Sequence, residues 1–198
     1  MSYPLALQKL ISFLRKFPGV GKKTAERFAF QIIYWKDLDL TAFAELLKSI
    51  KKDLITCSTC KALYDKARCP FCDLDIRDSN LLCVVASPKD IFTLEATGIY
   101  NGLYHAIPGL LSPVDHFGPS DLHFNELKER LSRHETKEVI LALDSTIEGD
   151  ATALFLKKEL EPAGIRVSRL AMGMPLGSSL DFLDEGTLTR AFSSRLPV

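Results

Sequence analysis

Four cysteines in two closely spaced pairs, Cys57-x-x-Cys60 and Cys69-x-x-Cys72, constrain this chain more than any other feature of its sequence. Each pair lets a tight turn present two thiolates to one ion, and two pairs complete a tetrahedral four-sulfur shell. The eight residues between the pairs are fewer than in the usual zinc ribbon but suffice for a small hairpin. We predict one structural zinc ion per chain, in a closed site that leaves no position for a substrate. Disulfide bonds are the alternative, and they are typical of oxidising compartments.

The charge of the chain is uneven, although its 25 basic and 25 acidic residues cancel. The segment before Asp53 carries 10 lysines and arginines against 4 acidic residues, whereas residues 81–198 carry 11 against 16. A basic segment attached to an acidic body favours an anionic partner for that segment, and a solvated helix surface is the alternative. No apolar run approaches the ~20 residues of a membrane span, and the N-terminus lacks a signal-peptide pattern. We therefore expect a cytoplasmic protein without a membrane partner.

Helical spacing of apolar residues dominates the first third of the chain. It predicts helices over residues 5–17, 23–35 and 41–54, with Thr41 as the N-cap of the third. The turn PGVG between the first two helices needs the conformational freedom of glycine at Gly19, Gly21 or both.

The second predicted helix begins with a basic sequence, GKKTAERF. The first backbone N–H groups of a helix lack intrahelical acceptors and lie at the positive end of its dipole, so they form a seat for phosphate. The pattern P-G-V-G-K-K-T-A-E-R resembles the helix-hairpin-helix motif of DNA repair and replication proteins. The candidate DNA contacts, independent of base sequence, are Gly19, Gly21, Lys22, Lys23 and Arg27. A plain helical connection and a dimerisation hairpin are the alternatives.

After the cysteines, short β-branched runs alternate with helical stretches. The runs LLCVVA, LYHAI, KEVILAL and IRVSRLA predict strands, and the intervening segments have helical patterns. Such alternation is typical of a parallel sheet covered by helices on both faces. The predicted fold class is therefore α/β and multidomain: a helical head, a small four-cysteine module, a parallel-sheet domain and a C-terminal helical tail.

The succession of these motifs along nearly the whole chain resembles the bacterial RecR family of recombination mediators. The resemblance extends through LLCVVASPKDIFTLEATGIYNGLYHAIPGLLSPVDHFGPSDL, KEVILALDSTIEGDATALFL and SRLAMGMPLGSSLDFLDEGTLTRAF. It implies four regions: a helix-hairpin-helix DNA-binding or dimerisation region (1–52), a four-cysteine zinc finger (53–78), a Toprim domain (79–172) and a C-terminal oligomerisation segment (173–198).

The family resemblance also implies a function and partners. Members act without chemistry of their own in recombinational DNA repair. They clamp DNA as homo-oligomeric rings, usually tetramers with dimers as the alternative, and they work with RecO, and in many bacteria RecF, to load RecA at single-strand gaps. We accordingly expect a nucleoid-associated protein.

Three carboxylates, Asp144, Glu148 and Asp150, follow a strand-like apolar run. Catalytic Toprim domains hold Mg²⁺ with a glutamate at the end of the first strand and a D-x-D pair after the third. Here Ala86 stands at the first position, and Thr146 replaces the second acid of the pair. We therefore expect no catalytic residue, and we expect these acids to dock a basic partner or to bind Mg²⁺ weakly. The alternative is a Mg²⁺-dependent Toprim nuclease or phosphotransferase that uses them.

Overall fold

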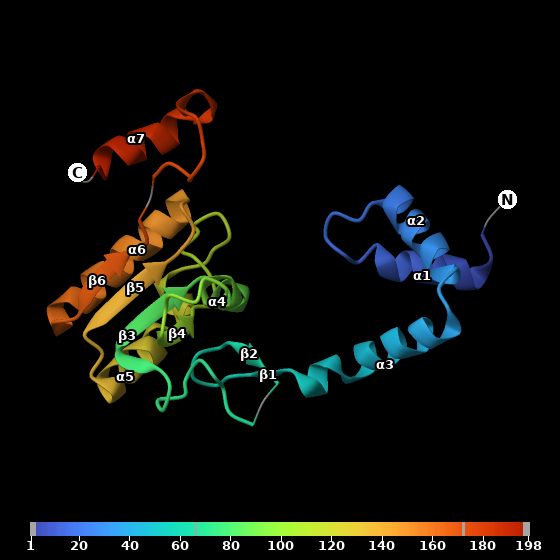
Figure 1. Cartoon of the computed structure of the whole chain (residues 1–198), viewed down its shortest axis with the longest axis horizontal. Helices are drawn as coiled ribbons and strands as arrows, with labels where there is room; N and C mark the ends of the chain where they lie inside the picture. Colours follow the sequence, from blue (N-terminus) through green and yellow to red (C-terminus); the bar gives the residue numbers. More distant parts are fainter. Residues whose placement is uncertain (1–2, 66, 172, 196–198) are drawn as a thin grey trace. The chain divides into compact units, whose positions relative to one another are not determined.

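A computed structural model describes the chain except for residues 1–2, 66, 172 and 196–198. The chain divides into two compact units, residues 1–54 and residues 55–198, which are described separately (Figure 1). None of the helices in the described part of the chain is both long enough and apolar enough to cross a membrane.

The first unit, called the head, consists of helices α1 (Leu5–Leu14), α2 (Lys22–Ile33) and α3 (Asp37–Asp53). Its small core is made by Ile11 of α1 against Ala25 and Ala29 of α2. Two of these three core residues are alanines, so the core of the head buries little apolar surface.

The third helix begins four residues before the predicted start. Thr41 is not its N-cap but lies inside the helix, and its hydroxyl donates to the carbonyl of Asp37 at 2.8 Å. Asp37 and Asp39 occupy the first turn, where the helix dipole stabilises negative charge. This favours the earlier start.

The second unit, called the body, is built on a parallel four-stranded sheet of order β4-β3-β5-β6. Its strands are β3 (Asp78–Val85), β4 (Gly102–Ala106), β5 (Glu138–Ala142) and β6 (Arg166–Arg169). Its helices are α4 (Pro88–Glu95), α5 (Phe124–His134), α6 (Ile147–Leu160) and α7 (Glu185–Ser193), with 3₁₀ turns at Pro119–Leu122, Glu161–Ala163 and Leu180–Phe182. The predicted fold class is confirmed.

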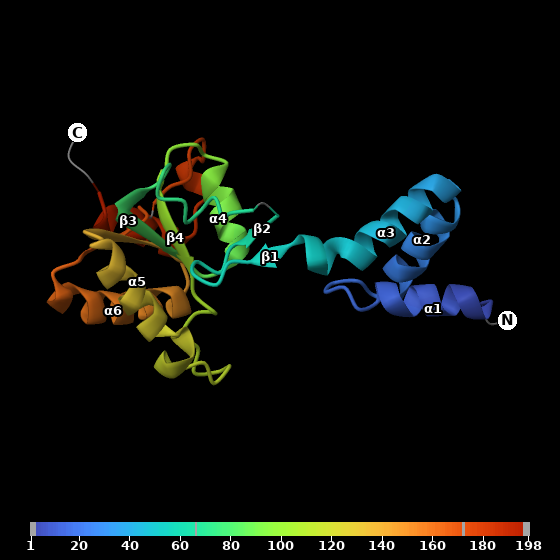
Figure 2. The same ribbon diagram turned by 90° about the horizontal axis from the view of Figure 1, so that it is seen from below.

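The two faces of the sheet are covered by different kinds of structure (Figure 2). Alternate side chains of the strands, such as Leu82 and Val84, pack against α5 and α6. The intervening ones, such as Cys83 and Val85, face α4 and the cysteine segment. The cysteine segment therefore contributes to the cover of a face for which helices were predicted.

The cysteine segment, here called the cysteine module (residues 55–77), contains a short antiparallel hairpin of β1 (Ile55–Thr56) and β2 (Leu63–Tyr64). The hairpin encloses the first cysteine pair, since Cys57 and Cys60 lie between its strands. In the hairpin loop the amide of Lys61 donates to the carbonyl of Cys57, and the amide of Cys57 donates to the carbonyl of Ala62.

Candidate functional site

The four cysteine sulfurs converge within the cysteine module. All four Sγ atoms lie within 4.8 Å of one another, with 3.9 Å between Cys57 and Cys72 and 3.5 Å between Cys60 and Cys69. A tetrahedron with zinc–sulfur bonds of about 2.3 Å has edges of about 3.8 Å. The donor set and its dimensions therefore fit a zinc ion without rearrangement of the fold.

Contacts between the sulfurs and burial raise the pKa of two of these thiols, those of Cys60 and Cys69, while no metal is bound. Contact with the sulfur of Cys72, together with burial, raises the pKa of Cys60, and burial raises the pKa of Cys69 to about 11. A hydrogen bond from Cys60 lowers the pKa of Cys72 to about 6. Because zinc binds the thiolate form, it must displace these protons, and its affinity falls as the pH is lowered.

Backbone and ionic contacts fasten the module to the body. The amide of Ala106, at the end of β4, donates to the carbonyl of Cys60 at 2.9 Å. Lys61 forms an ion pair with Glu126 of α5 at 2.7 Å. The module is thus bonded to both a strand and a helix of the body.

Arg77 forms a further attachment between the module and α4. Its two terminal nitrogens bind both oxygens of Glu95 at 2.6 and 2.7 Å, and its Nε donates to the carbonyl of Pro70. The hydrogen bonds from Arg77 lower the pKa of Glu95 below its usual range. Neither Arg77 nor the buried Arg130, whose Nη2 donates to the sulfur of Cys72, was found from the sequence. Their partners are distant along the chain, and no local spacing signals them.

No metal-ligand spacing relates the four histidines of the sequence to one another, which is typical of surface or ordinary polar residues. His105 instead lies on β4 and is 2% exposed. Burial lowers its pKa to about 4, so its imidazole is neutral at pH 7.

The glycine turn of the head presents the N-terminus of α2. Gly19 has φ +75°, a left-handed conformation that favours glycine, whereas Gly21 is the N-cap in extended backbone. No side chain caps α2, and its first turn holds no acid but begins with the exposed Lys22 and Lys23. Arg27 is also exposed, one turn later. The five predicted DNA contacts therefore lie at one end of the head.

A cavity of about 520 Å³ lies between the carboxyl ends of β3 and β5. The strand order reverses between these strands, which is where open α/β sheets bind ligands. The structure brings Asp144 and Glu148 together there with Ala86, beside Asp90 from the first turn of α4 and Asp115 from the loop after β4.

The start of α6 fixes the position of these acids. The hydroxyl of Thr146 accepts from the amide of Gly149, which caps the helix. A Cβ on Gly149 would lie 2.0 Å from the carbonyl oxygen of Asp144, so this close approach requires glycine.

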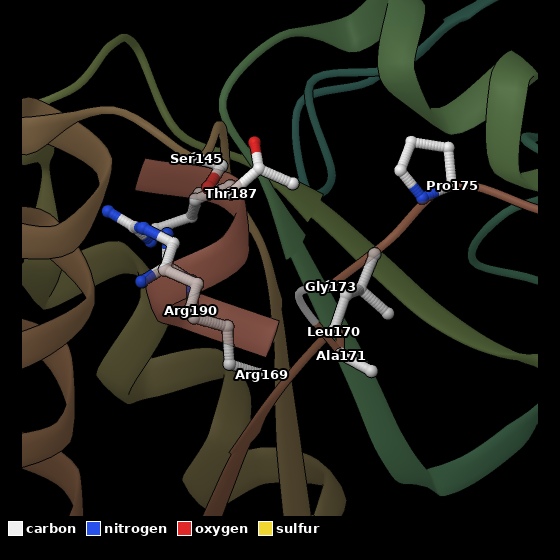
Figure 3. Close-up of a pocket in the computed structure, with 9 residues that line it drawn as sticks. Ser145, Arg169, Leu170, Ala171, Gly173, Pro175, Thr187 and Arg190 are labelled. Carbon is white, nitrogen blue, oxygen red and sulfur yellow. The ribbon is translucent and has the colours of Figure 1, made fainter. Parts of the chain in front are cut away.

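Asp150, the third predicted acid, does not line the cavity. Its carboxylate binds Arg169 at the end of β6 at 2.5 Å and Arg190 of α7 at 2.6 Å. The hydrogen bond from Arg190, and to a lesser degree that from Arg169, lowers the pKa of Asp150. The same arginines line a separate cavity of about 340 Å³ between the ends of β5 and β6 and helix α7 (Figure 3). Asp150 therefore links α7 to the sheet.

We predict that Cys69→Ser lowers the metal content of the purified chain well below the one zinc ion per chain expected of the wild type, and lowers its melting temperature. The substitution removes one of four ligands, and a structural zinc site contributes directly to folding. Metal analysis by mass spectrometry measures the first effect. Cys83→Ala is the control, because Cys83 is buried on β3 outside the cluster and should leave the zinc content unchanged. One zinc ion per chain in Cys69→Ser would contradict a four-sulfur site.

We predict that Asp150→Asn speeds amide hydrogen exchange in α7, because it removes the charge that holds Arg190. Since the pKa of Asp150 is lowered in the folded chain, this stabilisation is complete above the ordinary aspartate pKa of about 3.9 and is lost as the pH falls through the folded-state value. Asp144→Asn is the matched control, since Asp144 is exposed and lines the other cavity. Equal exchange in both variants would show that Asp150 does not hold α7.

Comparison with known proteins places these features in one family. Family models match the helix-hairpin-helix of RecR over residues 7–51, the Toprim domain over residues 80–171 and the C-terminal region of RecR over residues 173–195. The recombination protein RecR of Protochlamydia amoebophila is 51% identical over 195 residues, which cover 98% of both chains. That of Chlamydia felis is 47% identical over 100% of this chain and 99% of its own length. That of Chlamydia trachomatis serovar D is 46% identical over 98% of both chains. The chain therefore belongs to the RecR family of recombination proteins.

Proposed function

We propose that this chain is a DNA-binding mediator of recombinational repair that has no catalytic activity of its own. Its family membership supports a role in recombination, since the relatives are named recombination proteins. In this proposal the chain clamps DNA as an oligomeric ring and works with RecO, and with RecF where it is present, to load RecA at single-strand gaps. It acts on DNA in the cytoplasm, at the nucleoid.

The observation that carries the proposal is the N-terminus of α2, which presents basic side chains and has no side-chain cap. Lys22, Lys23 and Arg27 are exposed there, and a Cβ built at Gly19 or Gly21 meets nothing within 4 Å, so the turn is open to solvent. A DNA backbone can approach such a turn closely and accept hydrogen bonds from the first N–H groups of the helix. Interactions of this kind bind phosphate and do not read bases.

The acidic cavity serves in this proposal as a docking surface for a basic protein partner, for which RecO is the family's candidate. Asp144 and Glu148 line it, together with Asp90 and Asp115. Acidic side chains at a rim repel DNA and accelerate association with a positively charged protein. The carboxylate of Asp150 is bound by two arginines, so in this proposal Asp150 does not contact the partner directly.

The C-terminal segment, residues 173–198, is the proposed oligomerisation region. Its described part exposes large apolar side chains, among them Leu176, Phe182 at 88% and Phe192 at 72%. Apolar side chains gathered on one segment mark an interaction surface, and a ring of identical chains would bury them.

The proposal assigns no chemistry to the zinc ion or to the strand end at Ala86. The four cysteines hold zinc in a closed shell, so this ion supports the fold and takes no part in chemistry. At the cavity, the methyl group of Ala86 offers neither a metal ligand nor a proton donor where a catalytic Toprim domain would use glutamate. Four neighbouring carboxylates nevertheless favour the second candidate, a Mg²⁺-dependent nuclease or phosphotransferase.

We predict that replacing Lys22, Lys23 and Arg27 together with alanine weakens binding to gapped DNA. The slope of log affinity against log salt should decrease by about one for each phosphate that the variant no longer neutralises. Fluorescence anisotropy of labelled DNA across a salt series measures both the affinity and the slope. A variant in which Lys36, Lys51 and Lys52 of the same unit are replaced removes the same charge and should keep the wild-type slope. Equal slopes in all three proteins would overturn the proposed phosphate-binding role.

We predict no cleavage of labelled gapped DNA by the purified chain in the presence of Mg²⁺, because the strand-end acid is absent. Gel analysis over several hours measures this. Cleavage that persists in Asp144→Ala would reveal a contaminant. Cleavage that disappears in that variant would establish the enzyme instead of the non-catalytic mediator.

A further inference from the structure

Arg130 of α5 is a buried cation with no carboxylate partner in the described part of the chain. The residue is 3% exposed, and its Nη1 donates to the carbonyl of Tyr104 on β4. Among the described residues, no carboxylate oxygen lies within 4.0 Å of its guanidinium, and its Nε has no hydrogen-bond partner. Arginine cannot lose its proton in a protein, so a guanidinium buried without an anion destabilises the fold strongly.

Among the described residues that surround the guanidinium, one group can supply negative charge. Glu126 lies one turn away on the same helix, but its carboxylate is bound to Lys61 at 2.7 Å. His105, whose Nδ1 lies 3.5 Å from Nη1, supplies no negative charge. The remaining neighbour is the sulfur of Cys72, which accepts from Nη2 at 3.3 Å.

We propose that Arg130 is the counter-ion of the zinc–thiolate centre, a positioning residue that couples metal binding in the cysteine module to α5 and β4 of the body. Four thiolates around Zn²⁺ carry a net charge of −2, and Arg130 neutralises part of it through the hydrogen bond to Cys72. The metal in turn keeps all four sulfurs ionised and so adds negative charge beside the buried guanidinium. The inference rests on the four-cysteine zinc site and is independent of DNA binding.

The geometry explains why arginine is suited to this position. The Nη1 of the guanidinium donates to the carbonyl of Tyr104 and the Nη2 donates to the sulfur of Cys72, so a single side chain joins a strand to a predicted metal ligand. Residues that hydrogen-bond to metal ligands without contacting the metal typically change metal affinity 10–100-fold when they are replaced.

The test compares Arg130→Gln, which keeps hydrogen-bond donors but loses the charge, with Arg130→Lys, which keeps the charge. Arg133→Gln, an exposed arginine on the same helix, is the control. Zinc affinity is measured by competition with a chromophoric chelator, and the cobalt-substituted proteins are compared by their sulfur-to-cobalt charge-transfer absorption. We expect a loss of zinc affinity of roughly 10–100-fold in Arg130→Gln, with a shifted absorption band, a smaller loss in Arg130→Lys and none in Arg133→Gln.

Wild-type affinity in Arg130→Gln, or equal losses in Arg130→Gln and Arg130→Lys, would overturn the proposal. If Arg130→Gln does not fold, nitrogen-15 spectra of the wild-type arginine side chains, in protein loaded with cadmium-113, decide the question. A coupling between cadmium and an Nη proton of Arg130 supports the proposal, and its absence contradicts it. A wild-type chain that bound no zinc would refute the metal site itself, which distinguishes that failure from a failure of the role of Arg130.

Discussion

The contact between the cysteine module and the sheet is the constraint on which the body depends. A parallel sheet must be covered on both faces, and α4 with the module covers the face that carries Cys83, Val85 and Tyr104. The hydrogen bond from the amide of Ala106 to the carbonyl of Cys60 fixes the module at the end of the edge strand β4. Metal binding by the cysteines would therefore stabilise the cover of the sheet as well as the module.

The local patterns of the sequence predicted most of the elements, and long-range packing decided the rest. Apolar periodicity predicted the strands and helices of the body, and the two C-x-x-C pairs predicted the four sulfurs that lie close together. Asp144 and Ala86 both follow strand-like runs in the sequence, and they meet in the structure because strands of a parallel sheet end at one edge. It did not reveal that Asp150 turns towards Arg190, 40 residues away, or that Arg130 reaches Cys72, 58 residues away. No spacing rule encodes such pairs.

The arrangement separates the proposed tasks of the chain. In the proposal the head binds DNA through a basic helix end, and the body docks a protein partner at an acidic cavity, at the position where open α/β sheets bind ligands. Ala86 supports the docking role over catalysis, and the ion pairs of Asp150 connect the cavity-bearing helix α6 to α7, the helix of the proposed oligomerisation segment. The proposed DNA binding, partner docking and assembly therefore fall on different surfaces of the chain.

Amide hydrogen exchange of the full chain, with its zinc and after removal of zinc by a chelator, tests the central claim most directly. Chelation should accelerate exchange in β4 and α4, which share the face of the sheet with the module, while α1 and α2 of the head keep their protection. The fluorescence of Trp35, the single tryptophan, reports separately that the head stays folded. Unchanged exchange in β4 and α4 after complete loss of zinc would contradict the dependence of the body on the metal-bound module.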